Sequence, residues 1–330
     1  MHKLTLFFSI ILVSLSGVAQ NNMLQLGDTA RAEYPYIFPI LGDKAHEQGF
    51  DLPLPAGIMV NYFYAVQDIA IPDIAVGFND GILPEIPLTD ITRLIEFEEV
   101  RATAYTVNVR PDLWVLPFLN VYGIFGKTWS QSNVKISYPF TLNTVAKLEG
   151  ASYGLGVTGA SGIGKYFFVL DGNWVWTMLT NFEEPVKSRV FSFRLGRAFP
   201  VGKNEKSNVA FWVGGMRVRM GGITEGTITL GEVIPEEGWN RRDEIVDEYY
   251  IWYDNADPLK QAAADKVLTP IVESIGAANG DGIVHYKITK KPVQEWNMII
   301  GGQYQINKVW QLRAEGGVIG NRKSFLFSVN

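Results

Sequence analysis

Alternation with a period of two residues is the feature of this sequence that most restricts its fold. From Trp310 to Val318, one set of alternate positions reads Trp310, Leu312, Ala314, Gly316 and Val318, and the other reads Gln311, Arg313, Glu315 and Gly317. Side chains along a β-strand point alternately to opposite faces, so this segment has one apolar face and one charged face. Several other segments repeat the pattern with Trp, Tyr, Phe and Met on the apolar face, and in one of them, 208–220, Trp212 and Met216 are predicted to face outward. This is typical of strands that face lipid on one side and a polar lumen on the other.

The alternating segments are long enough to cross a bilayer as tilted strands, which takes roughly 9–11 residues each. They are Gly57–Gln67, Val100–Arg110, Leu113–Lys127, Ala151–Ala160, Lys165–Thr177, Lys187–Phe199, Asn208–Met220, Val293–Ile306, Val309–Ile319 and Lys323–Asn330. Short connectors at Pro111-Asp112, Ser161-Gly162, Val201–Ser207 and Asn307-Lys308 alternate with long ones at 68–99, 128–149, 178–186 and 221–292. Bacterial barrels alternate short periplasmic turns with long external loops in this way. The sequence therefore predicts an all-β fold, a transmembrane antiparallel up-and-down β-barrel of about ten strands.

The longest connector, the external loop 221–292, has structure of its own. Thr224–Leu230 and Val284–Ile288 alternate and could form a projecting hairpin, which would raise the strand number to about twelve. Between them, apolar residues recur at helical spacing from Pro258 to Ala277, so we expect a helix over about 258–277. Pro270 should kink or divide it.

The N-terminus predicts export. Residues 1–19 read as a signal peptide, with Lys3, an apolar run from Leu4 to Leu15 and small residues up to Ala19, near which we expect cleavage. Residues 20–56 predict an irregular lead-in or a plug in the lumen, and 57–330 the barrel. The last strand reaches Asn330 without the usual final aromatic residue, so we expect the natural chain to continue further. The predicted location is the bacterial outer membrane.

Composition excludes several kinds of chemistry. The sequence has no cysteine, which rules out thiol chemistry and cysteine-based metal sites. Beyond the predicted signal peptide the only histidines are His46 and His285, far apart in the sequence, which is a weak basis for a catalytic base or a metal site. We therefore expect no catalytic residue, no metal and no cofactor. A net charge of −5 argues against a nucleic-acid partner.

Three segments resemble a group of Gram-negative outer-membrane β-barrel proteins of uncharacterised activity. The segments are Arg110–Gly123, Leu52–Gly57 and Leu170–Trp174. The resemblance covers about a fifth of the chain and implies a barrel in the outer membrane, and it implies no activity.

Charged side chains on the predicted inner face are the first candidates for a functional site. They are Arg110, Asp171, Arg194, Arg217, Arg219, Arg313 and Glu315. Two interpretations are open. The side chains could form a paired network that fills the lumen, since buried charges must be paired or they destabilise the fold by several kcal/mol. Alternatively they form a constriction that attracts anions, because arginine outnumbers the acids.

The external loop supplies a second candidate. Tyr249, Tyr250, Trp252 and Tyr253 follow an acidic stretch and could pack on the predicted helix or form a recognition surface. Arg241 and Arg242 could contact lipopolysaccharide phosphates. The expected partners are outer-membrane lipid and lipopolysaccharide, the barrel-assembly machinery, and an unknown small solute or protein.

Three functions follow from these expectations. The first is a small passive channel or transporter for small solutes, with an anion preference. The second is a non-conducting structural or surface-recognition barrel that acts through its external loop. The third, a barrel-embedded hydrolase, needs a nucleophile and an acid within hydrogen-bond reach of His285, for which Asp281 is the nearest acid in the sequence. An open water path would favour the first, and paired charges that fill the lumen would favour the second.

Overall fold

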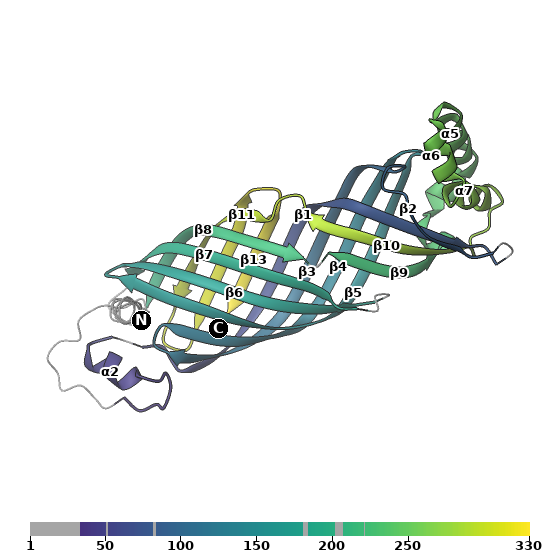
Figure 1. Cartoon of the computed structure of the whole chain (residues 1–330). Coiled ribbons are helices and arrows are strands. Elements are labelled where there is room, and N and C mark those ends of the chain that lie inside the picture. Colours follow the sequence, from purple (N-terminus) through teal and green to yellow (C-terminus); the bar gives the residue numbers. More distant parts are fainter. Residues whose placement is uncertain (1–33, 51, 82–83, 181–183, 202–206, 221) are drawn as a thin grey trace, which may run out of the picture.

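The chain folds into a closed, tilted β-barrel that continues on one side into a sheet and a helical cap (Figure 1). The computed structural model describes residues 34–50, 52–81, 84–180, 184–201, 207–220 and 222–330. Within these ranges ten antiparallel strands form the barrel, and β13 pairs with β1 to close it, with Val329 opposite Val60. The strands are β1 (Ala56–Asn79), β3 (Glu96–Leu116), β4 (Leu119–Tyr138), β5 (Leu142–Ile163), β6 (Tyr166–Leu179), β7 (Val186–Pro200), β8 (Asn208–Met220), β11 (Trp296–Gln305), β12 (Gln311–Ile319) and β13 (Lys323–Val329). The predicted transmembrane up-and-down barrel is confirmed.

Three further strands extend the barrel wall on the side of the long connectors. They are β2 (Ile86–Asp90), β9 (Ile223–Thr229) and β10 (Ile283–Pro292). Strands β9 and β10 pair with each other as the predicted projecting hairpin, and β10 pairs with the second half of β1, from Ile69 to Asn79. The first half of β1 pairs instead with β13, from Val60 to Val66. Beyond the end of the short β12–β13 hairpin, β10 therefore replaces β13 as the neighbour of β1.

Two of the predicted external loops are largely strand. Most of 128–149 belongs to β4 and β5, which stay paired from Gly159 opposite Leu119 up to Leu142 opposite Ile136. Much of 68–99 belongs to β1, β2 and β3. The strand segments predicted from the sequence were therefore too short. Outside the bilayer no lipid selects for an apolar face, so the alternation that marks a membrane strand weakens there although the hydrogen-bonded ladder continues.

Two predicted turns lie elsewhere. Pro111-Asp112 is inside β3, with Pro111 opposite Ile58, and the ladder between β3 and β4 skips Arg110 and Pro111. A gap in the ladder accommodates a residue that has no N–H to donate. The chain turns at Pro117-Phe118 instead. After β5 it turns at Gly164, two residues beyond the predicted Ser161-Gly162, with a φ of +62° that favours glycine.

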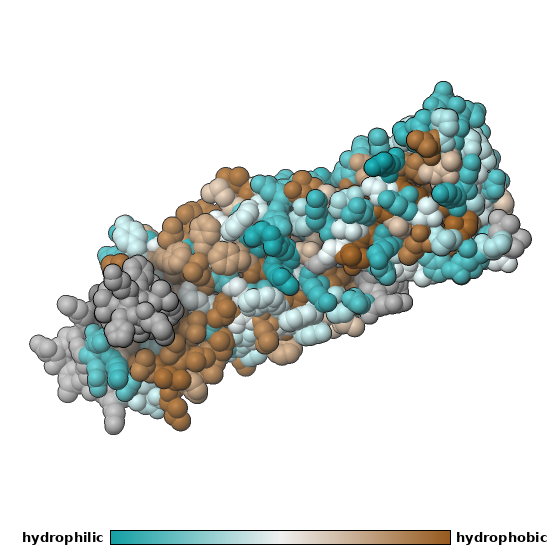
Figure 2. Space-filling view, viewed as in Figure 1, coloured by the Kyte–Doolittle hydropathy of each residue, from teal (hydrophilic) through white to brown (hydrophobic). Residues whose placement is uncertain are grey.

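The outer wall of the barrel is apolar. Figure 2 shows hydrophobic residues concentrated over the barrel and hydrophilic residues over most of the extension and cap. Exposed outward side chains include Val107, Phe125, Leu155, Trp174, Leu195, Phe211, Ile300 and Phe327. Such a surface suits the hydrocarbon of a bilayer, and the polar extension and cap project beyond it. Among the described residues no helix is both long and apolar enough to cross a membrane.

Five short helices cap the extension. They are α3 (Leu230–Val233), α4 (Glu236–Asn240), α5 (Arg242–Asn255), α6 (Pro258–Ala264) and α7 (Leu268–Gly276). The helix predicted over 258–277 is thus two helices, α6 and α7. They are separated at Asp265–Val267 rather than at Pro270, which lies in the first turn of α7, where a missing N–H costs little.

Helix α5 was not predicted, because its many acidic residues suggested a solvated loop. Its Ile245, Tyr249 and Trp252 lie on one face and join the hydrophobic core of the cap. The core also contains residues of α7 and of the extended strands, among them Leu268, Val272, Ile275, Phe78 and Phe140. The cap is therefore a folded unit with a core of its own above the barrel.

The N-terminal part lies at the opposite end of the barrel. Helix α2 (Gly42–Glu47) belongs to a segment that reaches the β3–β4 turn, where the backbone N–H of Ile40 donates to the carbonyl of Val115 at 2.8 Å. Figure 1 shows α2 beyond the strand ends on that side. The predicted signal peptide 1–19 and its cleavage near Ala19 lie outside the described residues.

Candidate functional site

A buried ion pair crosses the lumen between two strands that are not neighbours. Arg194 of β7 donates from Nε and Nη2 to the two carboxylate oxygens of Glu315 of β12, at 2.6 and 2.9 Å. The two residues are 6% and 3% exposed. A bidentate guanidinium–carboxylate contact fixes both side chains in orientation as well as in charge.

Glu315 accepts hydrogen bonds from two further side chains. Trp212 of β8 donates from its indole Nε1 at 2.8 Å, and Arg313 donates from Nη2 at 3.2 Å. The Arg313 guanidinium also lies over the Trp212 ring, 5.0 Å from the centroid. Gly301 of β11 leaves room for this ring, since a Cβ there would lie 2.6 Å from indole atoms.

A second carboxylate belongs to β6, the neighbour of β7, where Asp171 lies opposite Ser192. Asp171 of β6 accepts from the hydroxyl of Tyr122 at 2.8 Å and from that of Thr158 at 2.6 Å. The Arg110 guanidinium stacks on the Tyr122 ring, 3.3 Å from its centroid, and donates to Thr158 Oγ1 at 3.3 Å. Asn173 donates to the Tyr122 hydroxyl at 3.4 Å.

We call these side chains the lumen network: Arg110, Tyr122, Thr158, Asp171, Arg194, Trp212, Arg313 and Glu315. The structure thus brings together five of the seven predicted inner-face residues. Three arginines meet two carboxylates, so the lumen network has a formal charge of +1. Its buried side chains occupy the lumen at this level.

Arg217 and Arg219 were predicted to face inward, and that prediction is wrong. They share a parity with Phe211 and Val213, both more than half exposed on the outer wall, and pair there with Glu295 at 2.6 and 3.0 Å. Trp212, predicted outward, is 4% exposed in the lumen. Both faces of β8 carry large apolar residues, so hydrophobicity alone does not identify its lipid face.

Several inward polar residues were not predicted from the sequence as site residues. Tyr122, Thr158 and Trp212 complete the lumen network. Tyr122 shares its parity with Asn120, and Thr158 with Ser152, whereas the neighbours of Trp212 on the same parity are mostly apolar. Nearer the end of the barrel where α2 lies, Asn120 donates to Asp112 at 2.7 Å. Toward the cap, buried Arg322 donates to the Met216 carbonyl at 3.3 Å, while its Nε and Nη1 have no partner among the described residues.

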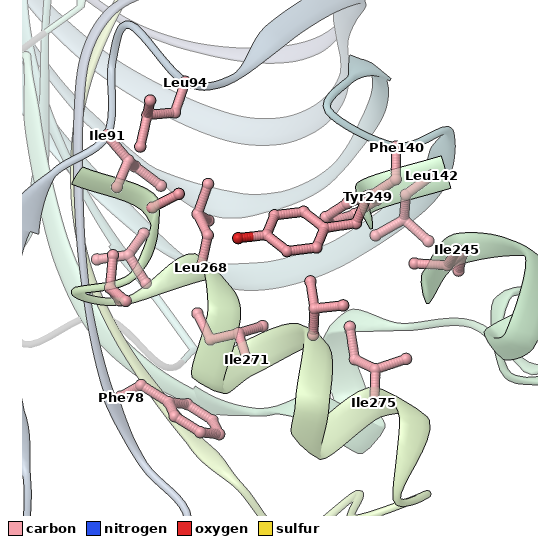
Figure 3. Close-up of a cluster of buried hydrophobic side chains, with 14 of the residues drawn as sticks. Phe78, Ile91, Leu94, Phe140, Leu142, Ile245, Tyr249, Leu268, Ile271 and Ile275 are labelled. Carbon is pink, nitrogen blue, oxygen red and sulfur yellow. The ribbon is translucent and has the colours of Figure 1, made fainter. Parts of the chain in front are cut away.

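The predicted external recognition residues divide into two pairs. Tyr249 and Trp252 pack in the core of the cap with residues of α7, which agrees with the first of their two interpretations and excludes them from a recognition surface. Tyr250 is exposed and Tyr253 half-buried. Figure 3 shows the Tyr249 ring in the centre of the core, with Leu268 on one side and Phe140 and Leu142 on the other. Burial raises the pKa of Tyr249 to about 12, and its hydroxyl lies 2.7 Å from Thr269 Oγ1.

His285 lies on the exposed strand β10. Its Nδ1 is 3.3 Å from Thr227 Oγ1, and its Nε2 is 3.6 Å from the carboxylate of Glu85, not of Asp281. The second distance is longer than a hydrogen bond. No group of three or more potential metal ligands occurs among the described residues.

The sequence matches none of the protein-family models, and no curated protein matches it. Solved structures with a similar course of the chain include the β domain of the Bordetella autotransporter BrkA, which is 7% identical with a TM-score of 0.34. The match covers 84% of this chain and 98% of that one. An outer-membrane channel from Pseudomonas putida F1 is 8% identical with a TM-score of 0.28, covering 86% and 98%.

The Ralstonia pickettii toluene transporter TbuX is 7% identical with a TM-score of 0.28, covering 83% of this chain and 88% of that one. These similarities are too low to transfer any property to this chain. Its assignment as a transmembrane β-barrel depends on the strand pairing and on the apolar outer wall.

Proposed function

We propose that this chain is an outer-membrane barrel whose lumen is closed in the conformation described, and which holds its folded cap at the cell surface for recognition. The lumen network is the observation that carries this proposal. Its carboxylates are paired with arginine, tryptophan, tyrosine and threonine donors on strands around the barrel. A chain that only needed a water-filled pore would gain nothing from cross-lumen pairs that obstruct it.

The energetics support a closed state at rest. Separating a buried guanidinium from its carboxylate leaves two uncompensated charges, which costs about 3–5 kcal/mol. Arg194 and Glu315 are both almost fully buried, so this cost applies to them. An opening that moves β7 away from β12 must therefore be driven by a partner or a solute. On this proposal the chain is not an enzyme, since His285 meets only one of its two candidate partners, Thr227 and Glu85, at hydrogen-bond distance.

A second candidate function, a channel for small solutes with an anion preference, has one observation in its favour. The lumen network carries one more arginine than carboxylates, and Nε of both Arg110 and Arg313 is buried without a partner among the described residues. Unmet donors on a cationic lumen would suit an anion. Passage would still require Arg194 and Glu315 to separate.

Conductance in a planar bilayer separates the two candidates. We expect the refolded wild-type protein, verified by its heat-modifiable migration on a gel, to show no steady conductance. The double variant R194A/E315A removes the cross-lumen pair and should conduct. The matched control E295A removes a carboxylate from the outer wall and should stay silent. Steady, anion-selective conductance of the wild type would refute the closed barrel and establish the channel.

A further inference from the structure

Four basic side chains gather on the outer wall at the ends of β7 and β8 nearest the cap. Lys187 and Arg189 belong to β7, and Arg217 and Arg219 belong to β8. Arg189 lies directly opposite Arg219 in the ladder between the two strands. We call these four residues the outer basic patch.

Among the residues that the structure describes, few acidic side chains pair with the outer basic patch. Glu295 is shared between Arg217 and Arg219. The side chains of Arg189 and Lys187 make no hydrogen bond or ion pair with any residue that the structure describes. Four cations and one carboxylate leave a formal charge of +3. Like charges directly opposite each other in a sheet destabilise it, so the pairing of Arg189 with Arg219 favours an anion between them.

The outer basic patch lies where the apolar wall ends. Below Arg189, outward positions of β7 hold Phe191, Phe193 and Leu195, and the next cation is Arg197. At roughly 3.4 Å per residue and a tilt of about 40°, Arg189 and Arg197 are separated by roughly 20 Å across the bilayer, close to the height of a barrel's apolar band.

Aromatic residues mark the same level. Trp174 lies opposite Arg189, and Trp296 lies opposite Arg217, whose guanidinium is 6.0 Å from the Trp296 ring centroid. Exposed tryptophan is typical of the interface between hydrocarbon and headgroups. The four cations therefore lie at headgroup depth, on the side of the cap.

We propose that the outer basic patch binds the phosphate groups of an anionic lipid in the outer leaflet, the chemistry presented by lipid A of lipopolysaccharide. Guanidinium groups bind phosphate through paired hydrogen bonds, and a multiply charged headgroup would neutralise several cations together. The inference rests on the proposed outer-membrane location. Arg241 and Arg242, predicted for this role from the sequence, are instead paired with Glu244 and Asp243 on the cap.

The test compares lipid binding by the folded, detergent-solubilised full chain and by R189Q/R219Q. The readout is the shift in melting temperature on titration with diphosphoryl lipid A, with dephosphorylated lipid A and inorganic phosphate as the other two probes. We expect only diphosphoryl lipid A to stabilise the wild type. The double variant removes two of the four cations near the anionic surface, so it should bind at least about tenfold more weakly.

The matched control is R197Q, which removes an outward arginine from the same strand at the opposite end of the apolar band and should bind as the wild type does. Equal binding by R189Q/R219Q, or an equal shift with dephosphorylated lipid, would overturn the proposal. An equal shift with inorganic phosphate would reduce the patch to a general anion site and overturn the lipid assignment. None of these results bears on conductance, so a silent bilayer would leave the closed barrel standing even if lipid binding failed.

Discussion

Arg194 and Glu315 join β7 to β12 across the lumen, although β8 and β11 separate these strands in the barrel wall. Backbone hydrogen bonds connect each strand only to its neighbours. This side-chain pair therefore links strands that the backbone ladder does not join. Trp212 and Arg313 donate two further hydrogen bonds to the same carboxylate. Its removal is the sharpest test of what the lumen network contributes to stability.

We expect Glu315→Ala to lower the free energy of unfolding by about 3–5 kcal/mol, because it leaves Arg194 and Arg313 buried without their carboxylate. The double variant R194A/E315A should cost less than the sum of the two single variants, since it removes both members of the pair. Urea unfolding of the protein in lipid vesicles, followed by tryptophan fluorescence, measures all three. Strictly additive losses would show that the pair is not coupled.

Tyr122→Phe removes one of the two hydroxyl donors to Asp171 and keeps the ring on which Arg110 stacks. A hydrogen bond to a charged group contributes about 1.5–3 kcal/mol, so we expect a loss in that range in the same urea experiment. Tyr105→Phe on the outer wall is the control and should leave the stability unchanged. A neutral Tyr122→Phe would mean that water replaces the lost donor.

The core of the cap should respond independently of the barrel. Ile275→Ala leaves a cavity among buried side chains and should destabilise the cap by about 2–5 kcal/mol. Leu259→Ala, at a position that is 84% exposed, is the matched control and should have little effect. Hydrogen exchange of the α5 and α7 amides reports on the cap, and heat-modifiable migration reports on the barrel. Loss of the folded barrel in the Ile275 variant would contradict a separate core.

Tyr249 predicts how the cap responds to pH. Its pKa is raised by burial from 10.0 to about 12, so the folded cap keeps a proton that the unfolded cap releases above pH 10. Between pH 10 and 12 the unfolded state therefore binds fewer protons than the folded state, so the free energy of unfolding should fall as the pH rises through this range. Below pH 10 Tyr249 is protonated in both states and adds no pH dependence.

Tyr249→Phe should flatten this dependence when hydrogen exchange or near-UV circular dichroism is followed against pH. The comparison with the wild type is needed because Tyr253, hydrogen-bonded to Asp265, also has a raised pKa and acts in the same direction. An identical pH profile for the variant would assign the fall to other tyrosines.

The barrel itself could be predicted from the sequence because lipid imposes a clear signal on its strands. β8 was predicted residue for residue as Asn208–Met220, yet its inner face was assigned wrongly. Trp212 was read as a lipid-facing aromatic, whereas it is an indole donor to a buried carboxylate. Period-two patterns locate a strand, but where both faces are apolar they do not orient it, and only the partner across the lumen resolves this.

The cap shows a second reason why structure could not be predicted from sequence patterns alone. The spacing of Ile245, Tyr249 and Trp252 is helical and was visible in the sequence. The acidic residues around them, however, favoured the prediction of a solvated loop. An acidic helix remains stable when one apolar stripe packs on a core, and that core is assembled from α7 and from strands far away in the sequence. Such long-range partners explain why α5, and the choice between packing and recognition for Tyr249, emerge only from the three-dimensional structure.

Strand β1 pairs with β13 along its first half and with β10 along its second half. Closing a barrel joins the first strand to the last, and the entropy lost in such a closure grows with the length of chain between them. Because β10 precedes β11 in the chain and pairs with β1, the loop between this contact and the β1–β13 contact contains only the segment from β11 to β13. The extension toward the cap thereby reduces the chain entropy lost when the membrane-embedded seam is sealed.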